Sequence, residues 1–170
     1  GAFDPTLGGA SELWGFGAET APEHRPAADA AAACRGPNWQ SLVLEETGRV
    51  AVQPGELRLD LSGIAKGFAV DEMMRTVKAF GISDGLVGLD GELAASGAKP
   101  DGTPWHVAVE KPDYELRSAL GTIELRDAAV ATSGDYRHWI EVGKTRLSHT
   151  MDRLRGGPVD NAVASVSVVA

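Results

Sequence analysis

The segment LDLSGIAKGFAVDE, residues 59–72, combines a hydroxyl, two glycines and a lysine at a spacing that could bind an anion. Ser62 is a favourable N-cap residue, so a helix that begins there would present unpaired backbone N–H groups to a ligand. Such a helix start attracts phosphate, and Lys66 in the first turn adds a full positive charge. Gly63 and Gly67 lie four residues apart on one side of the helix, where a flat ligand or another backbone could come close. The alternative is that these glycines only allow tight packing on a sheet, and helix physics alone favours that alternative.

A second candidate is ATSGDYRHWIEVGKTRLSHTMD, residues 131–152. His149 lies between Ser148 and Thr150 near the end of an expected strand, and Asp152 follows it. A histidine beside a carboxylate can act as a general base near neutral pH. A strand histidine with an ordinary structural role is at least as common, so both interpretations stay open.

A third candidate is GAFDPTLG, in which Asp4 precedes Pro5. Asp4 would cap a helix that begins at Pro5, and Phe3 could serve as a hydrophobic staple or a stacking surface. As a local motif this is only a helix start. Acidic side chains elsewhere could contribute to a site for a hard cation, although most acids in such an acidic chain are solvated; they are Asp60, Asp71, Asp90 and Glu92.

The composition is that of a globular domain, and 170 residues are enough for a real core. The net charge of −8 argues against nucleic acid as the main partner, because no basic stripe is present to neutralise phosphates. An anionic ligand would then need a metal ion, a helix N-terminus or a single lysine. Cys34, the only cysteine, is expected to be a small buried hydrophobe, and no apolar run reaches the length of a transmembrane helix.

Strands are the main elements expected to position these residues. Between Trp39 and Leu61, the segments SLVLEE, VAVQ and LRLDL alternate apolar and polar residues between turn signals, which is typical of antiparallel strands with one wet face. Further strands are expected at GLVGLDGELAASG, WHVAVEKP, GTIELRD, AAVATSG, HWIEVG, TRLSHTM and VASVSVVA.

Few helices are expected. Residues 4–17 suggest a short helix that ends in a glycine-rich turn, and residues 26–36 suggest an alanine-rich surface helix. The helix from Ser62 is expected to run to about Phe80, with a buried face made of Ala69, Met73, Val77 and Phe80. The fold class is therefore α+β, a largely antiparallel sheet with a few helices packed on it.

Taken in order, these segments resemble the ApbE family of FAD:protein FMN transferases. The resemblance rests on GAFDPTLG with ELWGFG, LDLSGIAKGFAVD, GLVGLDGELAASG with GTPWHVAVEKP, AVATSGDYRHWIEVGKTRLSHTMD, and ASVSVVA. Each motif is weak alone, but the ordered set is specific and spans nearly the whole chain. The resemblance implies an ApbE-like, T-fold-related architecture. It also leads us to expect that residues 1–170 are the central part of a longer domain, with N- and C-terminal parts missing.

The activity implied by the resemblance is cleavage of FAD at its pyrophosphate and transfer of FMN to a threonine hydroxyl of a target flavoprotein. AMP is released, and magnesium is required. In-line displacement at phosphorus needs charge neutralisation on the pyrophosphate and a base near the attacking hydroxyl. Two alternatives stay open: an FAD-binding maturation or carrier protein without transfer activity, and an FAD pyrophosphatase that gives FMN and AMP.

Site roles follow from the resemblance residue by residue. His149 matches the histidine proposed as the general base, and Ala65 matches the residue whose backbone carbonyl binds the metal. The residues that match FAD contacts, or that would lie near the phosphates or the flavin, are Ala2, Phe3, Asp4, Ser62, Lys66, Phe68, Thr150 and Met151.

The chain departs from the family pattern in two motifs. The family usually reads HIIDPRTG where this chain reads HTMDRLRG, and it commonly reads GGD where this chain reads DGE at residues 90–92. The family's remaining metal ligands belong to an ADALAT-like segment beyond the ASVSVVA strand, so we expect this piece alone to hold metal and FAD incompletely. By resemblance, the protein is expected at the periplasmic or extracytoplasmic face of the inner membrane, often as a lipoprotein, with a respiratory redox flavoprotein as its acceptor.

Overall fold

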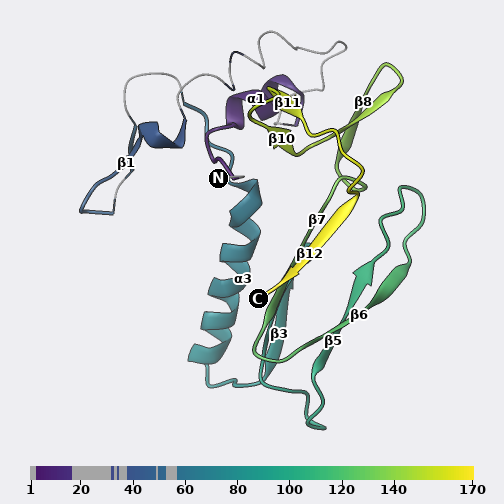
Figure 1. Cartoon of the computed structure of the whole chain (residues 1–170). Coiled ribbons are helices and arrows are strands. Elements are labelled where there is room, and N and C mark those ends of the chain that lie inside the picture. The colour runs from purple at the N-terminus through teal and green to yellow at the C-terminus, as the bar shows by residue number, and fades with distance from the viewer. Residues whose placement is uncertain (1–2, 17–31, 33, 35–37, 49, 53–56) are drawn as a thin grey trace. The chain divides into compact units, whose positions relative to one another are not determined.

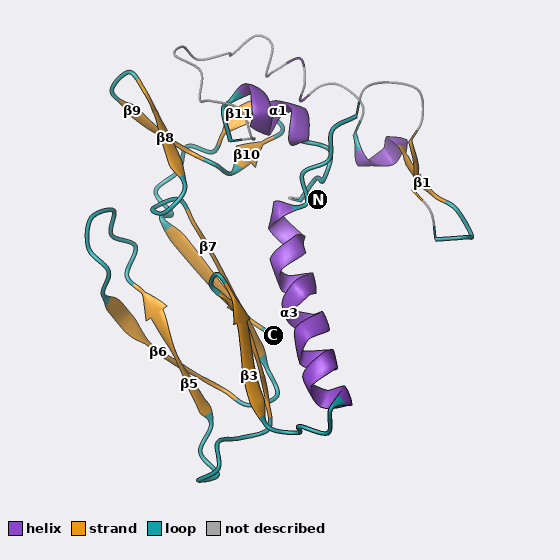
Figure 2. Cartoon of the chain, turned by 180° about the vertical axis from the view of Figure 1, so that it is seen from behind, coloured by secondary structure: helices purple, strands orange, loops and turns teal. Residues whose placement is uncertain are grey.

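The computed structural model describes residues 3–16, 32, 34, 38–48, 50–52 and 57–170. The chain forms two compact units, Gly1–Leu61 with His138–Ala162 and Ser62–Arg137 with Val163–Ala170. All strand pairs of the described residues are antiparallel, and few helices accompany them, which confirms the predicted α+β class (Figures 1 and 2). None of the described helices is long and apolar enough to cross a membrane.

The unit that begins at Ser62 is a sheet with helix α3 on one face. Its four-stranded sheet has the order β12-β7-β4-β3. Val70 and Met74 of the helix pack against Ala94 of the sheet. The elements are α3 (Ser62–Ala79), β3 (Gly85–Leu89), β4 (Glu92–Ser96), β7 (Ala129–Gly134) and β12 (Ser165–Val169).

A hairpin covers the other face of the same sheet. It is formed by β5 (Trp105–Glu110) and β6 (Ala119–Leu125). Its Val107 and Leu125 join Ala95 of β4 in one buried cluster. Because successive strand residues point to opposite faces, Ala94 meets the helix and Ala95 meets the hairpin. The unit thus has three layers, with the sheet between helix α3 and the β5–β6 hairpin (Figure 2).

The other unit is made of short hairpins and short helical segments. Its small core contains Leu7, Ala10 and Cys34, with Met151 packed against them, which confirms the prediction that Cys34 is a buried small hydrophobe. The elements are α1 (Gly8–Leu13), the 3-10 helix η1 (Trp39–Ser41), β1 (Leu42–Leu44), β2 (Val50–Val52), β8 (Trp139–Val142), β9 (Thr145–Ser148), β10 (Met151–Asp152) and β11 (Gly157–Pro158). The strands pair as β1–β2, β8–β9 and β10–β11.

Helix α1 ends in the glycine-rich turn that the sequence predicts. Gly15 has a φ of +83°, and its N–H donates to the carbonyl of Glu12 over 2.9 Å. The N–H of Phe16 donates to the carbonyl of Ser11, also over 2.9 Å. These two bonds form a Schellman motif, in which a glycine adopts the left-handed conformation at little cost. The turn therefore fixes the position of Phe16.

Two predictions about the segments before α3 are wrong. LRLDL, residues 57–61, is not a strand. Its backbone bonds an irregular segment instead: the N–H of Gly8 donates to the carbonyl of Arg58 (3.1 Å), and that of Asp60 donates to the carbonyl of Pro5 (2.8 Å). The first helix begins at Gly8 rather than Pro5, because the residues before it form a turn that the Asp4 carboxylate closes onto Thr6.

The predicted buried face of α3 is also wrong, although its extent from Ser62 to Ala79 is confirmed. Met73 and Phe80 are 39% and 82% exposed, whereas Val70 and Met74 are buried. Apolar residues occupy both of these neighbouring stripes of the helix, so their spacing could not decide between them. For the alanine-rich helix at residues 26–36, the described residues 32 and 34 are helical, and the other residues lie outside the described part.

Candidate functional site

The residues predicted to form the site fall into two groups, one in each compact unit. Ser62, Ala65, Lys66 and Phe68 occupy the first two turns of α3. Phe3, Asp4, His149, Thr150 and Met151 belong to the unit of short hairpins. Ala2 lies outside the described residues.

Lys66 is held by the turn between β3 and β4. Its Nζ lies 2.8 Å from Oε2 of Glu92, 3.1 Å from the carbonyl oxygen of Asp90 and 3.8 Å from Oδ2 of Asp90. Asp90 and Gly91 turn the chain around the ammonium group with φ values of +45° and +99°. The DGE sequence, one of the departures from the family pattern, thus supplies counter-charges to Lys66. Asp90 and Glu92, which were candidates for a hard-cation site, thus bind the ammonium group of Lys66.

The start of α3 offers an exposed surface to a ligand. Ser62, Ala65 and Phe68 are exposed, and Phe68 is 66% accessible. A Cβ added to Gly67 would meet no atom of the described chain within 4 Å, so packing within that part does not explain this glycine. Close approach of a ligand at Gly67 stays a prediction.

The backbone carbonyl oxygen of Ala65 is a suitable ligand for a hard cation, but it does not form a complete metal site. A carbonyl oxygen in a helix accepts one backbone hydrogen bond and keeps a second lone pair, and magnesium prefers oxygen ligands. Among the described residues, however, no group of three or more histidine, cysteine, aspartate or glutamate side chains could hold a metal ion. The described chain therefore supplies single oxygen donors rather than a full ligand set.

His149 is oriented by a backbone carbonyl. In the β8–β9 hairpin, Trp139 pairs with Ser148, which brings His138 and His149 next to each other at the open end. Nδ1 of His149 lies 3.0 Å from the carbonyl oxygen of His138. Since a carbonyl only accepts, Nδ1 carries the proton, and a neutral ring then has its lone pair on Nε2. Nε2 makes no hydrogen bond within the described chain, so it can accept a proton from a bound substrate.

Asp152 does not orient His149. Its Oδ1 accepts hydrogen bonds from the backbone N–H groups of Leu154 (2.8 Å) and Arg155 (3.3 Å). This carboxylate therefore closes its own turn. The aromatic neighbours of His149 are the rings of Phe16 and His138, with centroids 6.4 Å and 5.8 Å away.

Asp4 is buried and fully engaged with its own chain. Oδ1 accepts from the Thr6 N–H (3.0 Å) and the Thr6 hydroxyl (2.5 Å), and Oδ2 accepts from Nη1 of Arg153 (2.7 Å). Burial raises the pKa of the Asp4 carboxyl, but the Thr6 hydrogen bonds and the Arg153 charge together outweigh it and lower this pKa below its usual value. The carboxylate therefore shapes the loop, and contact of this segment with FAD stays a prediction that rests on the exposed Phe3.

The ApbE family model matches residues 1–170, the whole chain. The chain belongs to the ApbE family. It is 39% identical over 169 residues to the FAD:protein FMN transferase of Vibrio cholerae serotype O1, covering 99% of this chain and 51% of that protein. The solved structure of an ApbE protein from Thermotoga maritima matches with a TM-score of 0.88 at 33% identity, covering 100% of this chain and 55% of that one. The apo flavinyl transferase ApbE of Pseudomonas stutzeri matches with a TM-score of 0.82 at 39% identity, covering 100% and 52%. The chain thus spans about half the length of these relatives.

This ApbE chain builds an unforeseen ion pair where its sequence departs from HIIDPRTG. Arg153, in the turn after His149, binds Asp4 across 149 residues of sequence. Nearby, Nε1 of Trp14 donates to the carbonyl of Gly156 (3.3 Å). A Cβ at Gly157 would lie 2.9 Å from the Trp14 ring, so only glycine fits that contact without movement. The N-terminal segment therefore packs against the β10–β11 hairpin and bonds to it. In the sequence, Arg153 in place of the family's proline was the feature that could have indicated this contact.

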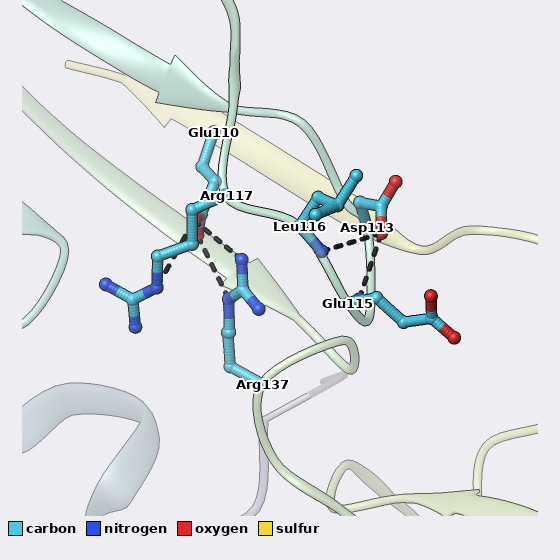
Figure 3. Close-up of polar contacts among 6 residues, drawn as sticks. All are labelled: Glu110, Asp113, Glu115, Leu116, Arg117 and Arg137. Carbon is cyan, nitrogen blue, oxygen red and sulfur yellow. Dashed lines mark hydrogen bonds and ion pairs between the residues drawn. The ribbon is translucent and has the colours of Figure 1, made fainter.

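A second polar network of this ApbE chain lies at the end of the β5–β6 hairpin (Figure 3). Glu110 accepts from Nε and Nη2 of Arg137 (3.3 and 2.7 Å), and Nε of Arg117 lies 3.8 Å away. The hydrogen bond from Arg137 is the main cause that lowers the pKa of Glu110. In the loop, Asp113 accepts from the backbone N–H groups two and three residues on (2.9 and 3.1 Å). Both carboxylates are engaged in holding the loop, so we assign this network a structural role.

Proposed function

We propose that the full-length protein is an FAD:protein FMN transferase, which cleaves FAD and attaches FMN to a threonine hydroxyl of an acceptor flavoprotein with release of AMP. The observation that carries the catalytic part is the bond between His149 Nδ1 and the His138 carbonyl, which leaves Nε2 available as a base. The names of the relatives, FAD:protein FMN transferase and flavinyl transferase, support the substrate and the reaction class. The chain would be the central part of the transferase domain.

In the proposed reaction, the threonine oxygen attacks the phosphorus atom of the FMN half, and Nε2 of His149 takes the hydroxyl proton. A new P–O bond forms to threonine while the P–O bond to AMP breaks, and the bonding electrons leave with the AMP phosphate. In-line displacement of this kind depends mainly on positioning and charge stabilisation.

Binding of the dinucleotide is proposed at the start of α3. The exposed helix start and the open space over Gly67 support a position there for the pyrophosphate, with Lys66 as a hydrogen-bond donor whose charge Glu92 and Asp90 already balance. The exposed Phe68 side chain of α3 would stack on a flat part of FAD. Ala65 is the residue of this chain proposed to bind magnesium, through its carbonyl oxygen. Magnesium, when bound, would neutralise charge on the pyrophosphate.

The test is to incubate the full-length protein with FAD, magnesium and a threonine-bearing acceptor, and to follow flavin on the acceptor by in-gel fluorescence and mass spectrometry. Covalent FMN on threonine with equimolar AMP is the expected result. Free FMN with AMP and an unmodified acceptor would indicate a pyrophosphatase, and bound intact FAD without turnover would indicate a carrier. Chelation of divalent metal is expected to stop turnover, and metal-independent transfer would contradict the proposed magnesium requirement.

We also propose that the protein acts at the periplasmic or extracytoplasmic face of the inner membrane, as a lipoprotein, on a respiratory redox flavoprotein. The family resemblance supports this location and this acceptor class. Protease accessibility in spheroplasts tests the location. Protection of the protein from added protease until the cells are lysed would contradict it.

A further inference from the structure

The imidazole of His149 is bounded by two other aromatic rings, Phe16 and His138. The His138 ring has its centroid 5.8 Å away at an interplanar angle of 72°, and the Phe16 ring has its centroid 6.4 Å away at 66°. Both pairs are edge-to-face, the arrangement that aromatic quadrupoles favour at this range. These rings, together with the His138 carbonyl on Nδ1, restrict the orientation of the imidazole.

Each neighbour is itself fixed by local structure. Phe16 follows the left-handed Gly15 and is anchored by the bond from its N–H to the Ser11 carbonyl. His138 directly precedes β8, and the pairing of Trp139 with Ser148 at the end of the β8–β9 ladder brings it next to His149. Restraint of His149 therefore comes from segments that are far apart in the sequence but belong to the same compact unit.

We propose that His138 and Phe16 are positioning residues for His149. The His138 carbonyl selects the tautomer with the proton on Nδ1. The two rings stop the imidazole from rotating about its side-chain bonds. Such a rotation would move Nε2 away from the substrate hydroxyl. A reacting group displaced by about 1 Å can lose on the order of a hundredfold in rate, so this restraint would affect turnover rather than substrate binding. The role in turnover rests on the proposed function, whereas the tautomer can be observed without any activity.

The experiment compares variants that keep or remove each ring in the full-length protein. His138→Phe and Phe16→Tyr keep an aromatic ring, whereas His138→Leu and Phe16→Leu remove it. His106→Leu is the matched control, because His106 lies on β5 in the other unit and pairs with Glu124. Thermal unfolding of every variant identifies any that fail to fold.

Two readouts separate positioning from a merely structural role. ¹⁵N NMR of the imidazole is expected to show the Nδ1–H tautomer of His149 in the parent and the ring-keeping variants, and a mixture of tautomers when both rings are removed. The turnover number is expected to fall about tenfold to a hundredfold in the leucine variants with KM for FAD within about twofold, and to recover in the ring-keeping variants.

Three outcomes would overturn the inference. An unchanged tautomer in the double leucine variant would show that the rings do not restrain His149. A turnover number within about twofold of the parent in that variant would contradict the positioning role. An equal loss in His138→Phe and His138→Leu would mean that the imidazole nitrogens of His138, rather than its ring, are needed. If His149→Ala retained transfer while the tautomer responded as expected, the proposed base would fail but the restraint of His149 would stand.

Discussion

Replacing Arg153 with leucine is expected to destabilise the protein by about 2 kcal/mol, because the buried carboxylate of Asp4 loses its cationic partner. The Asp4 side chain is only 6% exposed and that of Arg153 is 28% exposed. Removing one partner of a fully buried pair costs roughly 3–5 kcal/mol, and losing an exposed pair costs about 0–1 kcal/mol. The estimate lies between these limits, since Arg153 is partly solvated and Asp4 keeps its hydrogen bonds to Thr6.

The matched control is Arg155→Leu, two residues further along the same turn. Arg155 pairs with Asp160 over 3.3 Å, but these side chains are 51% and 84% exposed. Its loss is expected to change stability by less than about 1 kcal/mol. Urea unfolding at neutral pH measures both free energies of unfolding, and a cycle with Asp4→Asn isolates the coupling energy.

The effect of Arg153→Leu should also depend on pH in a definite direction. The pKa of Asp4 is lowered in the folded protein, so the stabilisation is fully present above about pH 4, where the unfolded carboxyl is ionised. It is lost as the pH falls through the folded pKa. The difference between parent and variant should therefore shrink in acid. Equal losses for Arg153→Leu and Arg155→Leu, or a loss that does not change with pH, would show that the buried Asp4–Arg153 pair does not stabilise the fold.

Two further predictions test the unit that contains α3. Lys66→Met should weaken FAD binding and destabilise the protein by about 1 kcal/mol, because Glu92, with a side chain 14% exposed, loses its cation; unchanged FAD affinity in equilibrium dialysis would contradict the site at α3. Gly134→Ala should cost about 1–3 kcal/mol, because its Cβ would lie 2.5 Å from Cε1 of Tyr136, whereas Gly121→Ala has open space and should cost less than about 0.5 kcal/mol. Equal melting temperatures for the two alanine variants would contradict the packing.

Local patterns in the sequence predicted most of the elements of this fold. The alternating segments predicted strands β3 to β9 and β12, and Ser62 began the long helix. The short strand β11 (Gly157–Pro158) lies in no predicted segment, and TRLSHTM is divided between β9 and β10. LRLDL failed as a strand because alternation does not reveal whether a ladder partner exists. The buried stripe of α3 failed because two stripes are apolar, and only the tertiary contact with Ala94 decides between them.

The roles of the site residues stay predictions, and the structure adds contacts that the sequence could not show. His149 and Lys66 could be singled out from motif order, whereas the carbonyl that orients His149 carries no side-chain signal at all. The Asp4–Arg153 pair joins residues at opposite ends of the chain, so no local window contains it. The sequence predicted that Asp4 caps a helix, but its carboxylate accepts hydrogen bonds from Thr6 and Arg153 instead.

The central claim is that Nε2 of His149 takes the proton of the acceptor threonine during FMN transfer. The most direct measurement is the single-turnover rate of covalent flavin formation by His149→Ala in the full-length protein, alongside FAD affinity measured by equilibrium dialysis. If Nε2 is the base, transfer should fall by at least about a hundredfold while FAD affinity stays within about twofold of the parent. A transfer rate like that of the parent would contradict it.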